Sequence, residues 1–95
     1  MTTYAIFIRD KVRDQSEFAV YGSKAGATLA GHDAKALVAY GPLETLEGAE
    51  AEGVVMIEFP SREAAKAWYQ GPAYQEVIKH RHLSADYRVI FADGL

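Results

Sequence analysis

The fold of this chain is decided by the stretch Gly53–Arg81, GVVMIEFPSREAAKAWYQGPAYQEVIKHR. Its first part, Val54–Phe59, is a run of β-branched and other apolar residues that predicts a buried strand. Ser61, which follows this run and a proline, is a residue type that caps helix N-termini. Gly71-Pro72 then interrupts the helical pattern, because proline breaks a helix yet suits the first position of a new one. The stretch therefore predicts a strand followed by a broken helix.

A further helix is predicted upstream from Asp14, which forms a capping-box pattern with Glu17. One face of this helix has apolar and small residues at helical spacing: Phe18, Tyr21, Gly22, Ala25, Gly26 and Leu29. We expect this face to point inward, with its two glycines allowing close approach to a sheet. Gly31 is expected to end the helix.

Three further apolar runs predict strands, at residues 4–9 (YAIFIR), 34–40 (AKALVAY) and 87–92 (YRVIFA). The acidic segment 43–52 is interpreted as a hairpin connection. The order is then βαββαβ in a single domain, residues 1–95, since this length suits one domain and not two.

Composition argues against several classes of function. The net charge is −3 without a long basic run, which disfavours a nucleic-acid-binding surface. The chain has no cysteine, which excludes disulfides, thiolate metal sites and a cysteine nucleophile. Its N-terminal apolar run is too short for a signal peptide core or a membrane span. We therefore expect a cytoplasmic protein that binds neither nucleic acid nor membrane.

The strands are predicted to be apolar on both sides of the sheet. In the third strand, Val55, Ile57 and Phe59 form one face, while Val54 and Met56 lie on the other. Right-handed crossovers place both helical segments on the same face of a four-stranded antiparallel sheet with strand order 4-1-3-2. An apolar face without a helix predicts a partner, and we expect a homodimer formed through the sheet faces.

The run EFPSREAAKAWYQGPAY (residues 58–74), with LEG at 46–48 and the closing ADGL at 92–95, resembles the DUF1330 family of the dimeric α/β-barrel superfamily. The resemblance spans nearly the whole chain. It implies an α+β, ferredoxin-like βαββαβ sandwich that pairs into a dimeric α/β barrel. One position departs from the family pattern, because Gly71 stands where the family usually has serine. Any role of that hydroxyl is absent here.

The resemblance leaves two functions open. Relatives in the superfamily include cofactor-free monooxygenases and isomerases, which suggests a small enzyme that acts without a cofactor on an organic acid or aromatic metabolite. The alternative is a non-catalytic dimeric module that binds a small ligand or serves as a scaffold. The pocket of such an enzyme would lie between the helices and the sheet of each protomer.

Four residues on the broken helix are candidates for binding a ligand. Trp68, Tyr69 and Tyr74 would line a pocket at the helix break, or simply belong to the core. Arg81 ends the inward stripe of this helix. Its guanidinium either stays in water while its stem covers apolar surface, or anchors a carboxylate or similar anion.

Glu58 is the candidate catalytic residue, because it is the one charge in an otherwise apolar strand. It either pairs with a cation, for which Arg9, Arg81 and Arg88 are candidates, or faces a cavity as a general acid or base.

The sequence predicts no metal site. His80 and His82 are two positions apart and project from opposite sides of a helix. We expect both to face solvent.

Overall fold

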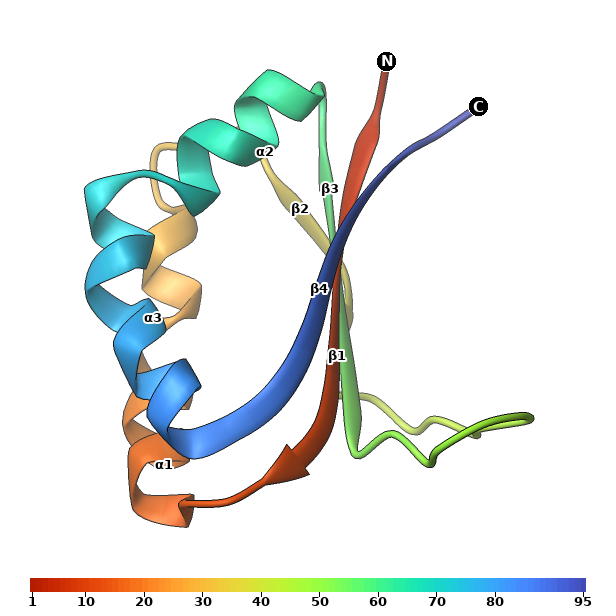
Figure 1. The fold of residues 1–95 in the computed structure, drawn as a ribbon. Coiled ribbons are helices and arrows are strands. Elements are labelled where there is room, and N and C mark those ends of the chain that lie inside the picture. Colours follow the sequence, from red (N-terminus) through yellow and green to blue (C-terminus); the bar gives the residue numbers. More distant parts are fainter.

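The computed structural model describes residues 1–95 and contains one antiparallel sheet with all its helices on one face (Figure 1). The strands lie in the order β2-β3-β1-β4, which is the predicted order 4-1-3-2. Their bounds are β1 (Thr3–Val12), β2 (Lys35–Ala39), β3 (Gly53–Phe59) and β4 (Ala85–Asp93). The helices are α1 (Gln15–Lys24), a 3-10 turn η1 (Gly26–Leu29), α2 (Arg62–Tyr69) and α3 (Pro72–Ser84). The expected α+β, ferredoxin-like fold is therefore confirmed.

Two helices begin at the predicted caps. The Oδ1 atom of Asp14 accepts a hydrogen bond from the backbone N–H of Glu17, at 3.1 Å. The Oγ atom of Ser61 accepts one from the N–H of Ala64, also at 3.1 Å. Each bond satisfies a donor that the first turn of a helix would otherwise leave unpaired.

The break between α2 and α3 lies where the sequence places it. Gly71 is the N-cap of α3 and Pro72 is its first residue. A Cβ atom on Gly71 would lie only 2.7 Å from the carbonyl oxygen of Ala67, so the chain turns here most easily with glycine. No side chain caps α3.

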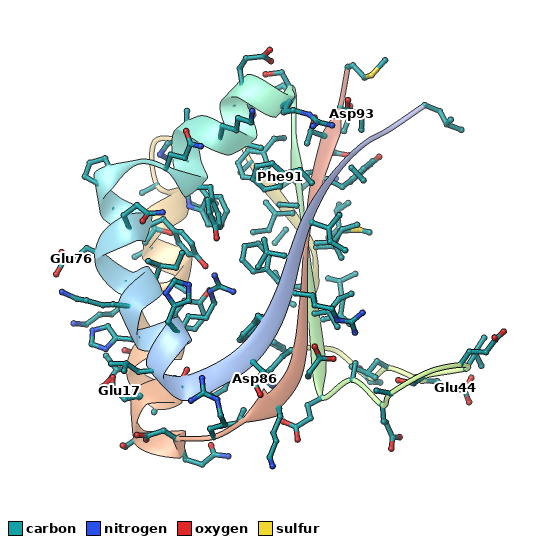
Figure 2. The ribbon with its side chains drawn as sticks, in the orientation of Figure 1. Glu17, Glu44, Glu76, Asp86, Phe91 and Asp93 are labelled. Carbon is teal, nitrogen blue, oxygen red and sulfur yellow. The ribbon has the colours of Figure 1, made fainter.

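The core lies between the helices and the inner face of the sheet. It is formed by buried residues from β1, β3 and all three α-helices: Ala5, Phe7, Tyr21, Ile57, Phe59, Ala65, Trp68, Tyr74, Val77 and Ile78. Figure 2 shows side chains filling this layer, with Phe91 of β4 among them. Because Ala5 and Phe7 face this core, the alternate residues of β1 face away from the helices.

The first helical segment differs from the prediction in two respects. It is not one helix up to Gly31, because α1 ends at Lys24 and η1 follows. The two glycines also do not make a close approach, since a Cβ atom on Gly22 or Gly26 would meet nothing within 4 Å. Large aromatic side chains separate the helix from the sheet, so the glycines leave space instead of allowing contact.

The outer face of the sheet has no helix over it (Figure 1). The strand registers place apolar side chains across this face: Tyr4, Ile6, Ile8, Val38, Val54, Met56 and Ile90. None of the helices has the length and apolar character needed to cross a membrane. The cytoplasmic location stays a prediction.

Candidate functional site: an aromatic cavity beside a buried arginine

A cavity of about 280 Å³ lies between the first helical segment and the inner face of β2 and β3. We call it the aromatic cavity. Its walls are mostly apolar: Phe7, Phe18, Tyr21, Gly22, Ala25, Gly26, Leu29, Ala36, Ala39, Tyr40, Val55, Ile57, Trp68 and Tyr74. All six residues of the predicted inward helix face are in this set. The space exists because glycine and alanine occupy positions that larger side chains would fill.

Two tyrosines that line the aromatic cavity are joined through their hydroxyl groups. The Oη atoms of Tyr21 and Tyr74 are 2.7 Å apart and share a hydrogen bond. Both side chains are buried. Two hydroxyl groups carry two protons, and this bond uses one of them. Since neither hydroxyl has another acceptor in the chain, one O–H group remains free to donate.

These phenols stay protonated at neutral pH. Burial raises the pKa of Tyr74 to about 12. Burial, reinforced by the neighbouring Tyr74, raises the pKa of Tyr21 further. The pair therefore acts as a hydrogen-bond donor and does not supply a phenolate base at neutral pH.

Tyr40 closes one side of the aromatic cavity. Its backbone has a φ of +59°, in the left-handed region that few non-glycine residues adopt. The guanidinium of Arg9 packs against the rings of both Phe18 and Tyr40, with its Cζ atom 4.7 Å and 4.8 Å from their centroids. The Tyr40 hydroxyl shares a hydrogen bond with that of Tyr87. These contacts hold the Tyr40 ring in place.

Trp68 and Tyr74 line the aromatic cavity on either side of the helix break in sequence. Their ring centroids are 4.4 Å apart. The Trp68 indole N–H donates to the Oγ1 atom of Thr28 at 3.0 Å, which satisfies its only polar group. Trp68 therefore offers a ligand only its apolar ring.

A second, more polar cavity of about 480 Å³ lies between the end of α3 and β4. We call it the arginine cavity. Arg81 lines it and is only 4% exposed. The side chain of Tyr69 also lines it, and the Tyr69 hydroxyl accepts a hydrogen bond from Nη2 of Arg81 at 3.3 Å. The two cavities share no lining residue, although the ring of Phe7 in the first is 5.8 Å from Cζ of Arg81.

The four candidates on the broken helix lie together on the helical side of the sheet. Trp68 and Tyr74 line the aromatic cavity, while Tyr69 and Arg81 line the arginine cavity. Trp68 and Tyr74 are also core residues, so the two interpretations of these rings are compatible.

Glu58 lies apart from the other candidates, on the outer face of the sheet. It is opposite Lys35 in the β2–β3 register. None of the three expected cations pairs with it within the chain. Arg9 pairs with Glu52 and Arg88 with Asp10, and Arg81 is on the helical side.

No group of three His, Asp or Glu side chains is placed so that it could hold a metal ion. His80 does not simply face solvent as expected, because its Nδ1 atom is 2.9 Å from Oε2 of Glu17. His82 lies beside Arg81, with its Nε2 atom 3.4 Å from Nη2.

Sequence reasoning missed three tyrosines of the site, Tyr21, Tyr40 and Tyr87. Tyr21 lies on the inward stripe of the first helix, a signal that marked it as buried but not as a cavity residue. Tyr87 is the first residue of the strand predicted at 87–92, which marked it as a strand residue and not as a cavity residue. No local signal identifies Tyr40, whose ring position depends on its left-handed backbone.

Solved structures with the same fold cover almost the whole chain. A protein of unknown function from Rhodopseudomonas palustris is 21% identical, covers 99% of this chain and 82% of its own, and has a TM-score of 0.75. A dimeric protein of unknown function with a ferredoxin-like fold, from Bacteroides fragilis, is 15% identical. The match covers 98% of this chain and 96% of that protein, with a TM-score of 0.64.

A third similar structure is SnoaB, a cofactor-independent oxygenase from Streptomyces nogalater. It is 10% identical, the match covers 99% of this chain and 92% of SnoaB, and the TM-score is 0.67. At these identities the likeness shows a shared fold. No curated protein matches the sequence. The model of the domain of unknown function DUF1330 matches residues 2–95. The chain therefore belongs to the DUF1330 family.

Proposed function

We propose that the protein binds a small aromatic molecule with an oxygen acceptor in the aromatic cavity. One observation carries this proposal: an apolar cavity of about 280 Å³ has a free O–H donor, from Tyr21 and Tyr74, at its wall. Ligand sites combine apolar walls with a few placed polar groups. A ligand carbonyl would accept a hydrogen bond from the remaining O–H group, which has no acceptor within the chain.

The test uses Trp68, the only tryptophan of the chain, whose ring lines the cavity. Titration with 1-indanone is expected to change its fluorescence saturably. Indane, which has the same ring system without the oxygen, should bind more weakly. Each single variant, Tyr21→Phe or Tyr74→Phe, keeps one free hydroxyl and should retain the preference for 1-indanone.

The double variant Tyr21→Phe/Tyr74→Phe removes both donors. It should bind 1-indanone no better than indane, a loss of roughly fivefold to tenfold for one hydrogen bond. Equal affinity of the wild type for the two compounds, or a double variant that still prefers 1-indanone, would contradict the proposal.

A second candidate function is a cofactor-independent enzyme, oxygenase-like or isomerase-like, acting on a ligand of this kind. It is favoured by the protonated tyrosine pair, because fixed O–H donors stabilise an enolate or phenolate oxygen that forms during a reaction. Burial raises the pKa of both phenols, and the positive charge of Arg81 opposes it by a smaller lowering of both pKa values. None of the lining residues is a carboxylate, imidazole or amine. The substrate would therefore have to be acidic enough to lose its proton to water.

An activity assay separates this enzyme from the alternative, a non-catalytic binding module. Oxygen consumption would be followed with 1,8,9-trihydroxyanthracene, an easily ionised aromatic compound, for the wild type and the double Tyr→Phe variant. Catalysis predicts a rate above the spontaneous one that the double variant loses. A rate equal to the spontaneous one in both would favour the binding module.

We also propose that two copies associate through the outer face of the sheet to give a dimeric α/β barrel. This proposal is supported by the apolar side chains of that face, of which Val38 and Ile90 are 39% and 47% exposed in the single chain. Exposed apolar patches of this kind commonly mark interfaces. The protein of similar fold from Bacteroides fragilis is described as dimeric.

A further inference from the structure

Arg81 is a buried cation that the chain does not neutralise. It is 4% exposed and takes part in none of the ion pairs. Its Nε atom is buried without a hydrogen-bond partner. The only polar contacts of its guanidinium are the long ones from Nη2 to Tyr69 and His82. A guanidinium stays charged in proteins, and burying an unpaired charge is costly.

Other features hold this cation in a fixed position. Its Cζ atom is 5.1 Å from the ring centroid of Tyr87 and 5.8 Å from that of Phe7, within the range of cation–π attraction. It also lies in the last turn of α3, where the helix dipole favours positive charge. These interactions orient the guanidinium and leave Nη1 without a partner. Unlike Nε, Nη1 is not among the fully buried atoms.

The arginine cavity itself is electropositive. Its only acidic residue, Asp86, is held by Arg13, with Nε and Oδ1 2.8 Å apart. Figure 2 shows Asp86 at the base of β4, beside the end of α3. Desolvation, together with the charge of Arg81, keeps the pKa of His82 below its usual value, so His82 is neutral at pH 7. Arg81 is therefore the uncompensated charge of the cavity, in a chain whose net charge is −3.

We propose that the arginine cavity is a separate site for the carboxylate of a small organic acid. The carboxylate would accept hydrogen bonds from Nη1 and Nη2 of Arg81, because the planar guanidinium matches two carboxylate oxygens. The apolar part of the acid would lie against Val89 and the ring of Tyr87, which line the same cavity. This site is independent of the aromatic cavity, since the two have no lining residue in common.

The test is an NMR titration of the full-length ¹⁵N-labelled protein with benzoate, and with benzamide as its uncharged counterpart. Benzoate is expected to shift the signals of Val89, Tyr87 and the Arg81 side chain saturably. It should bind at least tenfold more tightly than benzamide. Benzamide binding equally well would overturn the proposal. Benzoate-induced shifts confined to Phe18 and Leu29 of the aromatic cavity would also overturn it. The same holds if inorganic phosphate binds as tightly as benzoate.

Two variants complete the test. Arg81→Met should reduce benzoate affinity at least tenfold while its circular dichroism stays that of the wild type. Lys79→Gln removes one positive charge from an exposed position of the same helix and should leave the affinity unchanged. Wild-type affinity in Arg81→Met would overturn the assignment. The comparison of benzoate with benzamide on the wild type decides the question if Arg81→Met does not fold. Neither result depends on 1-indanone binding, which tests the aromatic cavity alone.

Discussion

The ring of Tyr40 lies directly against Gly53. A Cβ atom on Gly53 would be 2.6 Å from Cδ1 of Tyr40 and 3.0 Å from Cζ of Arg9. The glycine at the start of β3 therefore makes room for the stack of Arg9 and Tyr40 that closes the aromatic cavity.

Gly53→Ala is expected to displace Tyr40 and to lower the free energy of unfolding by about 1–3 kcal/mol, as overpacking usually does. Urea denaturation measures this effect. Gly41→Ala is the matched control, because a Cβ atom there meets nothing within 4 Å. If both variants are equally stable, the contact between Tyr40 and Gly53 has no energetic role.

Two substitutions at Gly22 test the role of the cavity in ligand binding separately from the stability of the fold. Gly22→Ala should raise the free energy of unfolding by about 1 kcal/mol, because it removes a glycine from a helix without a clash. Gly22→Leu should place its side chain in the aromatic cavity and abolish the fluorescence response to 1-indanone. Full 1-indanone binding by Gly22→Leu would mean that the ligand lies elsewhere.

Alkaline pH should destabilise the fold through its buried tyrosines. Folding raises the pKa of Tyr74 to about 12, above the ordinary value near 10. The neutral form is therefore favoured in the folded state, and its stabilising effect is complete below pH 10. It should be lost as the pH rises from about 10 to 12, by on the order of 2 kcal/mol. Urea denaturation across this range measures the loss.

Tyr74→Phe is the control for this titration. It should show a shallower fall in stability between pH 10 and 12, because one raised pKa is removed. Tyr21 and Tyr87, whose pKa values burial also raises, contribute what remains. An identical pH dependence in the two proteins would contradict the assignment to Tyr74.

The proposed dimer can be disrupted at Ile90. This residue is 47% exposed in the single chain and lies on the outer face of the sheet. Ile90→Glu should convert the dimer into a monomer in analytical ultracentrifugation at low micromolar concentration, since it would bury a charge in the interface. Leu83→Glu, an exposed leucine on α3, is the control and should remain dimeric. A wild-type protein that is monomeric under these conditions would refute the interface.

Glu58→Gln tests the remaining candidate. Because Glu58 has no ion-pair partner within the chain and lies on the outer face, we expect the variant to weaken self-association and to leave 1-indanone binding unchanged. Loss of an ionic partner supplied by the second copy would cost about 1–3 kcal/mol of dimerisation free energy. Loss of activity in an intact dimer would instead identify Glu58 as catalytic.

The fold was predictable because its signals are local. Proline and glycine mark the ends of β3 and the break at Gly71, and alternation along each strand separates the two faces of the sheet. Ser61 and Asp14 mark helix starts through contacts only three residues away. Such features depend on backbone preferences that neighbouring residues largely determine.

The aromatic cavity was not predictable in the same way, because it depends on distances between elements. The hydrogen bond between Tyr21 and Tyr74 joins residues 53 positions apart. Gly22 and Gly26 illustrate the difficulty, because a glycine on an inward face suits close packing and empty space equally well. Only the separation between helix and sheet distinguishes these cases, and aromatic side chains from several elements determine that separation.

The small residues around the aromatic cavity have a consequence for how this protein diverges from its relatives. Five positions leave the space open: Gly22, Ala25, Gly26, Ala36 and Ala39. A larger side chain at any of them would reshape the cavity without altering the course of the backbone. Relatives can thus inherit the fold unchanged and still differ in ligand after one substitution. When a ligand is identified for one member, the same ligand should be assigned only to members that keep these five residues small.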